Sequence, residues 1–75
     1  LLENKIQGTI DYMDNAMLLL NTDAGRREFT ISEDLVVVDE NGEEYSREDL
    51  QRDTAVTVTL DDAGQTAQRI TVRGQ

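Results

Sequence analysis

The chain has 75 residues, with 16 acidic and 7 basic side chains and a formal net charge of −9. This length predicts one domain, residues 1–75, with a thin hydrophobic core. Cysteine, histidine and proline are absent, which excludes disulfides and thiolate metal sites and removes the commonest general base. The acidic surface repels phosphate backbones and anionic lipid, and no apolar run approaches the ~20 residues of a membrane span.

The first predicted element is a strand over residues 5–14. Ile6, Gly8, Ile10 and Tyr12 alternate with polar residues, a period-2 pattern that assigns these four residues to the buried face. Glycine inside a strand is typical of a bulge or a sharp coil. We therefore expect this strand to bend at Gly8.

Two further strands are predicted before the middle of the chain. Residues 16–21 are largely apolar and lie between turn signals, and a helix is the competing interpretation. Six residues are too few for a helix, so we predict a strand. A turn containing Gly25 leads into residues 27–31, where Phe29 and Ile31 are expected to face the core.

The middle of the chain predicts a short strand, a turn and a helical turn. Residues 35–38 are apolar, and the following Asn41-Gly42 dipeptide is a strong hairpin signal. Residues 46–51 resemble the start of a helix, with Ser46 as the N-cap. Only one or two turns fit before the next strand, and Leu50 is expected to anchor them to the core.

The last part of the chain predicts a β-hairpin. Residues 54–60 alternate apolar and polar side chains, and a turn containing Gly64 leads into residues 66–72. Ala67 is out of phase with the later apolar positions of this second strand. If Ala67 is also buried, residues 68–69 form a bulge of the kind that helps to close a barrel.

Together these elements predict an all-β fold, a small five- or six-stranded antiparallel barrel (OB-like or SH3-like) with one short helical turn. An open two-sheet sandwich built from the same hairpins is the alternative. We expect positive φ at the turn glycines Gly25, Gly42 and Gly64. The predicted core comprises Ile6, Ile10, Leu18 or Leu19, Phe29, Ile31, Val36 or Val37, Leu50, Val56, Val58, Ile70 and Val72.

The sequence indicates no catalytic, cofactor-binding or metal-binding residue. The remaining candidates for catalysis are carboxylates, hydroxyls, two tyrosines and one lysine, in a chain too short to enclose a pocket of ~300 Å³. We therefore predict a protein that is not an enzyme and has no cofactor. The acidic segment 33–44 lacks the spacing of an EF-hand, so a solvated turn is the favoured interpretation and calcium binding the alternative.

The motifs of the chain resemble those of a group of small bacterial β-barrel domains of unknown function, roughly OB-like, that occur in exported and envelope proteins. The residues that carry the resemblance are Gly8-x-Ile10, Asp49-Leu50, Asp53-x-x-Val56-x-Val58 and Ala67-x-x-Ile70-x-Val72. The resemblance implies the barrel fold and an exported or periplasmic location, and it implies no catalytic residue. Asp53 stands where the group has glycine, at a position that often needs a left-handed backbone, which aspartate tolerates.

The predicted function is that of a non-catalytic binding or structural module whose partner is another protein or a flanking domain of the same chain. The alternative is an OB-type domain that binds oligonucleotides or oligosaccharides. The net charge argues against nucleic acid as a partner. It also predicts a monomer at neutral pH, because copies of the chain repel one another.

Overall fold

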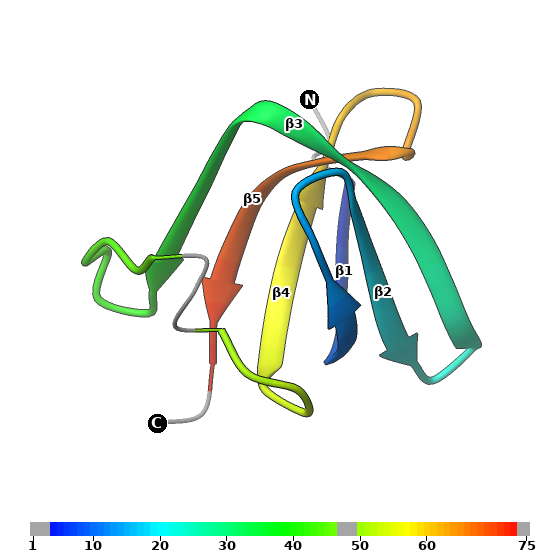
Figure 1. Cartoon of the computed structure of the whole chain (residues 1–75), viewed down its shortest axis with the longest axis horizontal. Coiled ribbons are helices and arrows are strands. Elements are labelled where there is room, and N and C mark those ends of the chain that lie inside the picture. Colours follow the sequence, from blue (N-terminus) through cyan, green and yellow to red (C-terminus); the bar gives the residue numbers. More distant parts are fainter. Residues whose placement is uncertain (1–3, 47–49, 74–75) are drawn as a thin grey trace.

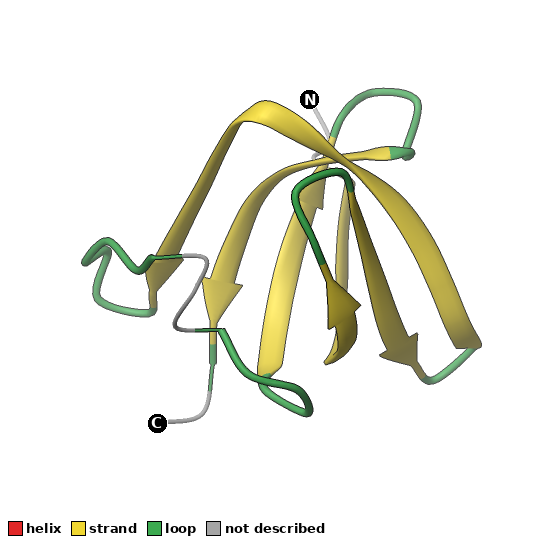
Figure 2. Ribbon diagram, in the orientation of Figure 1, coloured by secondary structure: helices red, strands yellow, loops and turns green. Residues whose placement is uncertain are grey.

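The structure, a computed structural model, describes residues 4–46 and 50–73, and these form a closed β-barrel without a helix (Figures 1 and 2). Its five strands are β1 (Asn4–Met13), β2 (Met17–Thr22), β3 (Gly25–Asp39), β4 (Ala55–Leu60) and β5 (Thr66–Val72). The order around the barrel is β1-β2-β3-β5-β4, and β4 pairs with β1 to close it. The predicted fold class, a small all-β barrel, is confirmed.

The pairing of the strands refines this prediction. β3 and β5 run parallel, whereas the other neighbouring strands are antiparallel, so the barrel is mixed rather than wholly antiparallel. β5 lies between β3 and β4, a Greek-key feature that OB-like barrels share. Because the sheet closes on itself, the arrangement is a barrel and not the open sandwich.

The segments 27–31 and 35–38 belong to one strand of 15 residues, and not to two strands as expected. Ile31 pairs with Ala67 of β5, but the next pair joins Val36 to Arg69. The four residues between them on β3 therefore lie opposite a single residue of β5. Figure 1 shows the sharp bend of β3, whose first half lies beside β2 and whose second half lies beside β5. The polar residues that interrupt the sequence pattern form this corner.

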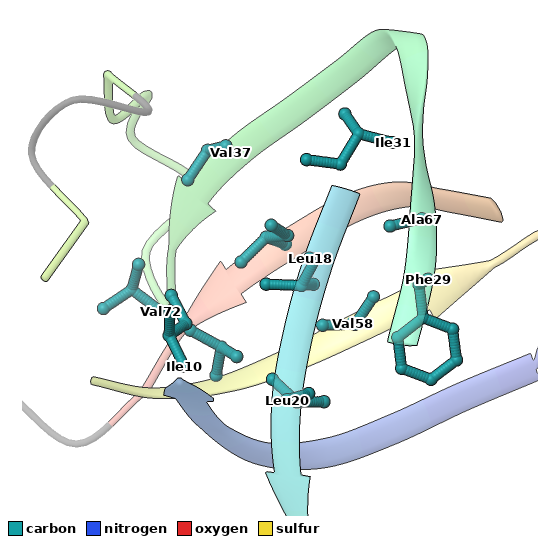
Figure 3. Packing of buried hydrophobic residues seen from close by; sticks show 11 residues of the cluster. Ile10, Leu18, Leu20, Phe29, Ile31, Val37, Val58, Ala67 and Val72 are labelled. Carbon is teal, nitrogen blue, oxygen red and sulfur yellow. The ribbon is translucent and has the colours of Figure 1, made fainter. Parts of the chain in front are cut away.

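The barrel interior is filled by apolar side chains from all five strands (Figure 3). Burial of a Phe or Leu side chain contributes about 1.5–3 kcal/mol, so Phe29, Leu18 and Leu20 are major contributors to stability. The prediction missed Leu20 and Val38, and Ile6 and Leu50 are only partly buried against the core. The buried residues are Ile10, Leu18, Leu20, Phe29, Ile31, Val37, Val38, Val56, Val58, Ala67, Ile70 and Val72.

Aspartate side chains at strand ends hold several of the turns. Asp14 Oδ1 accepts hydrogen bonds from the backbone N–H groups of Ala16 and Met17, at 2.7 and 2.8 Å. Asp61 Oδ1 accepts in the same way from the N–H groups of Gln65 and Thr66. These donors stabilise the charged carboxylate, so the pKa of both aspartates lies below the ordinary value of 3.8.

The turn geometry agrees with the sequence. The predicted glycines all have positive φ: Gly25, Gly42 and Gly64. Within the described residues, Asp53 is the one non-glycine residue with positive φ, at 70°, a backbone conformation that aspartate tolerates better than most residues. Its N–H donates to the carbonyl oxygen of Ile10 at 2.7 Å, which ties the start of β4 to β1.

Half of the predicted helical turn at 46–51 lies outside the described residues, because 47–49 are not among them. Its expected anchor, Leu50, does pack partly against the core. The segment before it folds back onto β3, where the N–H of Tyr45 donates to the carbonyl oxygen of Val37 at 2.8 Å. Tyr45 therefore lies on the brief return segment that the Asn41-Gly42 signal indicates.

Candidate functional site

A bulge in β1 determines which side chains of this strand face the outer surface of the barrel. Ile10 pairs with Leu20 and Tyr12 pairs with Leu19, so Asp11 has no partner of its own on β2. Two consecutive side chains therefore point outward, and Met13 takes the inward position against the core. Tyr12 was expected to be buried, but its exposed fraction is 48%.

The bulge lies between Ile10 and Tyr12 and not at Gly8, where a bulge or a sharp coil was expected. Gly8 lies against β2, and a Cβ there would overlap the backbone carbonyl oxygen of Asn21 and lie 3.0 Å from Leu20 Cγ. Gly8 is therefore needed because its missing side chain lets the two strands cross at short range.

The outward Tyr12 belongs to an apolar strip, defined here as Tyr12, Met17 and Leu19. Tyr12 and Leu19 are paired across β1 and β2, and Met17 lies two residues from Leu19 on the same face. Both Met17 and Leu19 are half-buried. On β3 the strip is bordered by Glu28 and Thr30, the partners of Leu19 and Met17. The strip thus presents an aromatic ring and two flexible apolar side chains to solvent.

The tyrosine of the strip is held in position by the adjacent turn. The Tyr12 hydroxyl donates to Asp14 Oδ2 at 3.0 Å, and the same carboxylate caps the turn through its other oxygen. This hydrogen bond and the negative charge of Asp14 raise the pKa of Tyr12 above its usual 10.0. The ring is therefore neutral at physiological pH and has a fixed direction.

A second surface feature, here called the polar trough, follows the outer side of β1. Gln7, Thr9 and Asp11 alternate with the inward residues of the strand. Arg73 Nη1 donates to Gln7 Oε1 at 3.3 Å. A groove of about 350 Å³ lies at this end of the strand, and a groove of about 380 Å³ lies at the other end, beside Asp11 and Tyr12. Both are open to solvent.

At the centre of the trough, one carboxylate lies between two guanidinium groups. Asp11 is within 3.4 Å of Arg26 Nη1 and also within 3.4 Å of Arg52 Nη2. The Asp11 side chain is 16% exposed, whereas those of Arg26 and Arg52 are 62% and 75% exposed. Such exposed ion pairs contribute little to stability, about 0–1 kcal/mol each. Most hydrogen-bonding positions of both guanidinium groups therefore face solvent.

The acidic segment 33–44 does not form a comparable cluster. Asp39 Oδ1 accepts hydrogen bonds from the N–H groups of Asn41 and Glu43, at 2.8 and 2.9 Å, and so stabilises the turn. In the described ranges 4–46 and 50–73, no three carboxylates lie close enough together to hold a metal ion. Over the same ranges, no helix has the length and hydrophobicity to cross a membrane.

Comparisons with known proteins find no matching family model, no similar curated protein and no similar solved structure. Sequence reasoning missed both the strip and the trough, because each depends on the bulge. The one sequence signal for the bulge is Met13, an apolar residue directly after Tyr12 that has no place in a strict alternation.

Proposed function

We propose that this chain is a non-catalytic binding module that contacts another protein through the apolar strip of Tyr12, Met17 and Leu19. The observation that carries the proposal is the outward position of Tyr12, a ring exposed against the alternation of its own strand. Tyrosine and methionine are enriched in protein interfaces, and aromatic anchors dominate their binding energy. An exposed ring that is already fixed loses little conformational entropy when a partner covers it.

The alternative within the OB class, an oligonucleotide-binding domain, has less support. Single-stranded nucleic acids need aromatic rings for base stacking and a positive groove for the phosphates. Tyr12 is the one exposed aromatic ring among the described residues, and the net charge of −9 repels phosphate.

Peptide display against the purified chain tests the proposal. We expect selected peptides to contain aromatic or aliphatic anchors and to lose at least tenfold in affinity for a Leu19→Ser variant. A Thr59→Ser variant is the matched control, because Thr59 lies on β4, away from the strip, and should leave the affinity unchanged.

Two results would contradict the proposal. One is a set of peptides whose affinity is the same for the Leu19→Ser variant and the wild type. The other is micromolar, salt-sensitive binding of single-stranded DNA, which would favour the oligonucleotide alternative.

A further inference from the structure

The turn that follows β3 contains an asparagine directly before a glycine, Asn41-Gly42, and both residues are exposed. Figure 1 shows this turn at the left edge of the molecule, on the far side from β2. In such a dipeptide the backbone nitrogen of the glycine can attack the side-chain amide carbon of the asparagine and close a five-membered ring. Glycine allows the attack because it has no Cβ to obstruct the approach to its nitrogen.

Two of the other asparagines are held within paired strands. Asn4 pairs with Leu60 across β1 and β4, and its side-chain amide donates to the carbonyl oxygen of Asp61 at 2.8 Å. Asn21 lies on β2 and is paired on both sides, with β1 and with β3. A backbone rearrangement at either residue requires a strand to open, which costs more free energy than the opening of an exposed turn.

The turn asparagine between β1 and β2 is the closest comparison with Asn41. Asn15 is followed by Ala16, whose N–H donates to the charged Asp14 Oδ1 at 2.7 Å. The N–H of Gly42 donates instead to a neutral acceptor, the carbonyl oxygen of Asp39, at 3.0 Å. Hydrogen bonds to charged acceptors are the stronger ones. The nitrogen that must attack is therefore released more easily at Gly42 than at Ala16.

We propose that Asn41 is a site of spontaneous covalent modification, in which it loses its side-chain amide through a cyclic imide formed with Gly42. The Gly42 nitrogen forms a bond to Asn41 Cγ, and the bond from Cγ to the amide nitrogen breaks. That nitrogen takes up the proton lost from the Gly42 N–H and leaves as ammonia. Water then opens the imide at either carbonyl, which gives aspartate or isoaspartate. Water is the one co-reactant, and no atom is oxidised or reduced.

The Asp39 side chain slows this reaction by holding the turn. Asp39 Oδ1 accepts hydrogen bonds from the N–H groups of Asn41 and Glu43, and the Asp39 carbonyl oxygen accepts from the attacking N–H of Gly42. An exposed hydrogen bond of this kind shifts an equilibrium by about two- to tenfold. The folded turn therefore retards the attack by a modest factor and does not prevent it.

The isoaspartate product changes the turn but leaves the barrel closed. It adds one methylene group to the backbone between residues 41 and 42, inside the loop closed by the bond from Asp39 N–H to the carbonyl oxygen of Glu43. The same turn aligns Tyr45, whose N–H donates to the carbonyl oxygen of Val37 at 2.8 Å. The pairings that close the barrel lie within the five strands. We therefore expect the modification to detach residues 43–45 from β3 and nothing more.

The experiment is incubation of the full chain at pH 8 and 0.15 M salt in water enriched in oxygen-18, followed by ion-exchange chromatography and peptide mass mapping. The salt screens the negative charges around the turn, which oppose loss of the Gly42 proton. We expect a product with one more negative charge and with the heavy oxygen at residue 41, as aspartate and isoaspartate. The rate at Asn41 should exceed that at Asn15 at least about fivefold. Amide shifts of the isoaspartate product should change at Val37 and Tyr45 and not in β1 or β2.

Three variants separate the role of the turn from general chemistry. Asn41→Gln keeps the amide but requires a larger ring, so the charge change should be lost. Asp39→Ala removes two turn hydrogen bonds and should accelerate the reaction about fivefold. Asp23→Ala makes the same change in charge in the turn between β2 and β3, and it should react like the wild type.

The proposal is overturned if the rate at Asn41 does not exceed that at Asn15, or if the new charge still forms in the Asn41→Gln variant. An unchanged rate in the Asp39→Ala variant would overturn the role of the turn. Shift changes throughout β1 and β2 would overturn the local effect. The apolar strip lies on β1 and β2, so none of these outcomes depends on the proposed protein partner.

Discussion

The barrel contains a bulge in β1 and another in β5, and the two differ in what the sequence reveals. In β5, Ala67 and Ile70 are buried and the two residues between them are exposed. In β1, Ile10 and Met13 point inward, and Asp11 and Tyr12 between them point outward. The geometry is the same, but the outward pair is polar in β5 and includes an aromatic residue in β1.

This difference explains why only one bulge is visible in the sequence. Two polar residues between two apolar ones break the period of 2, so the bulge at residues 68–69 could be predicted. Tyr12 instead continues the apolar alternation of Ile6, Gly8 and Ile10. Because the backbone turns Tyr12 away from the core, its ring packs only against its neighbour Leu19 on the outer face and remains 48% exposed. The hidden bulge is therefore the one with a surface suited to binding.

The largest expected effect compares added bulk at one residue of each bulged strand. The Gly8→Ala variant should lower the free energy of unfolding by about 3 kcal/mol, because the new methyl group meets the backbone of Asn21. Ala67→Val also adds bulk at a fully buried position, and overpacking of this kind should cost about 1.5 kcal/mol. Urea denaturation measures both. A smaller loss of stability for Gly8→Ala than for Ala67→Val would mean that β1 and β2 do not approach closely at this point.

The next expected effect separates the two neighbours at the β1 bulge. Met13→Ser should cost about 2 kcal/mol, because Met13 packs against the core. Tyr12→Ser should cost about 0.5 kcal/mol, as is usual for exposed positions. Urea denaturation shows directly which of the two variants loses more stability. The reverse order would restore the strict alternation that the sequence suggests and would remove the bulge.

A third prediction concerns the turns next to the bulged strands. The folded state lowers the pKa of Asp14, after β1, and of Asp61, before β5. Their contribution to stability is therefore present above pH 3.8 and is lost as the pH falls through the lowered folded-state pKa values. Asparagine can still accept the turn hydrogen bonds but does not titrate.

Thermal unfolding between pH 2 and pH 7 measures this effect. We expect the stability of the wild type to fall more steeply with decreasing pH than that of the Asp14→Asn/Asp61→Asn variant. Asp62→Asn is the control at the same turn and should behave like the wild type. Identical slopes for the wild type and the double variant would show that the turn carboxylates are not stabilised in the charged form.

The smallest expected effect is at Asp53, which connects to the β1 bulge through its hydrogen bond to Ile10. Glycine adopts a positive φ at a lower energetic cost than aspartate does. Asp53→Gly should therefore raise the free energy of unfolding by about 0.5 kcal/mol. Asp53→Ala should instead lower the free energy of unfolding by about 1 kcal/mol. Chemical denaturation of both variants provides the measurement, and a gain for alanine would contradict the left-handed geometry.

The sequence allowed prediction of the parts of the fold that depend on local chemistry. The turn glycines and the strands with strict alternation, such as the one with Val56 and Val58, were predictable in this way. The parallel pairing of β3 with β5 was not, because no local pattern records which distant strand lies alongside. The corner of β3 was missed for the same reason: the sequence predicts separate strands over 27–31 and 35–38, whereas the structure joins them into one strand.

The candidate surfaces were unpredictable for a related reason. The apolar strip needs Tyr12 to point outward, and the trough needs Asp11 to lie between Arg26 and Arg52, which are 26 positions apart in the sequence. Both conditions follow from one extra residue in β1. A single bulge thus converts a pattern that indicates only a core strand into two different surfaces.

A nuclear Overhauser spectrum of the wild type tests this bulge most directly. We expect contacts from the Met13 methyl group to methyl groups of the core, and contacts from the Tyr12 ring to Leu19 without contacts to Val56 or Val58. Strong contacts between the Tyr12 ring and those core valines, with Met13 free of core contacts, would contradict the bulge and with it the proposed surfaces.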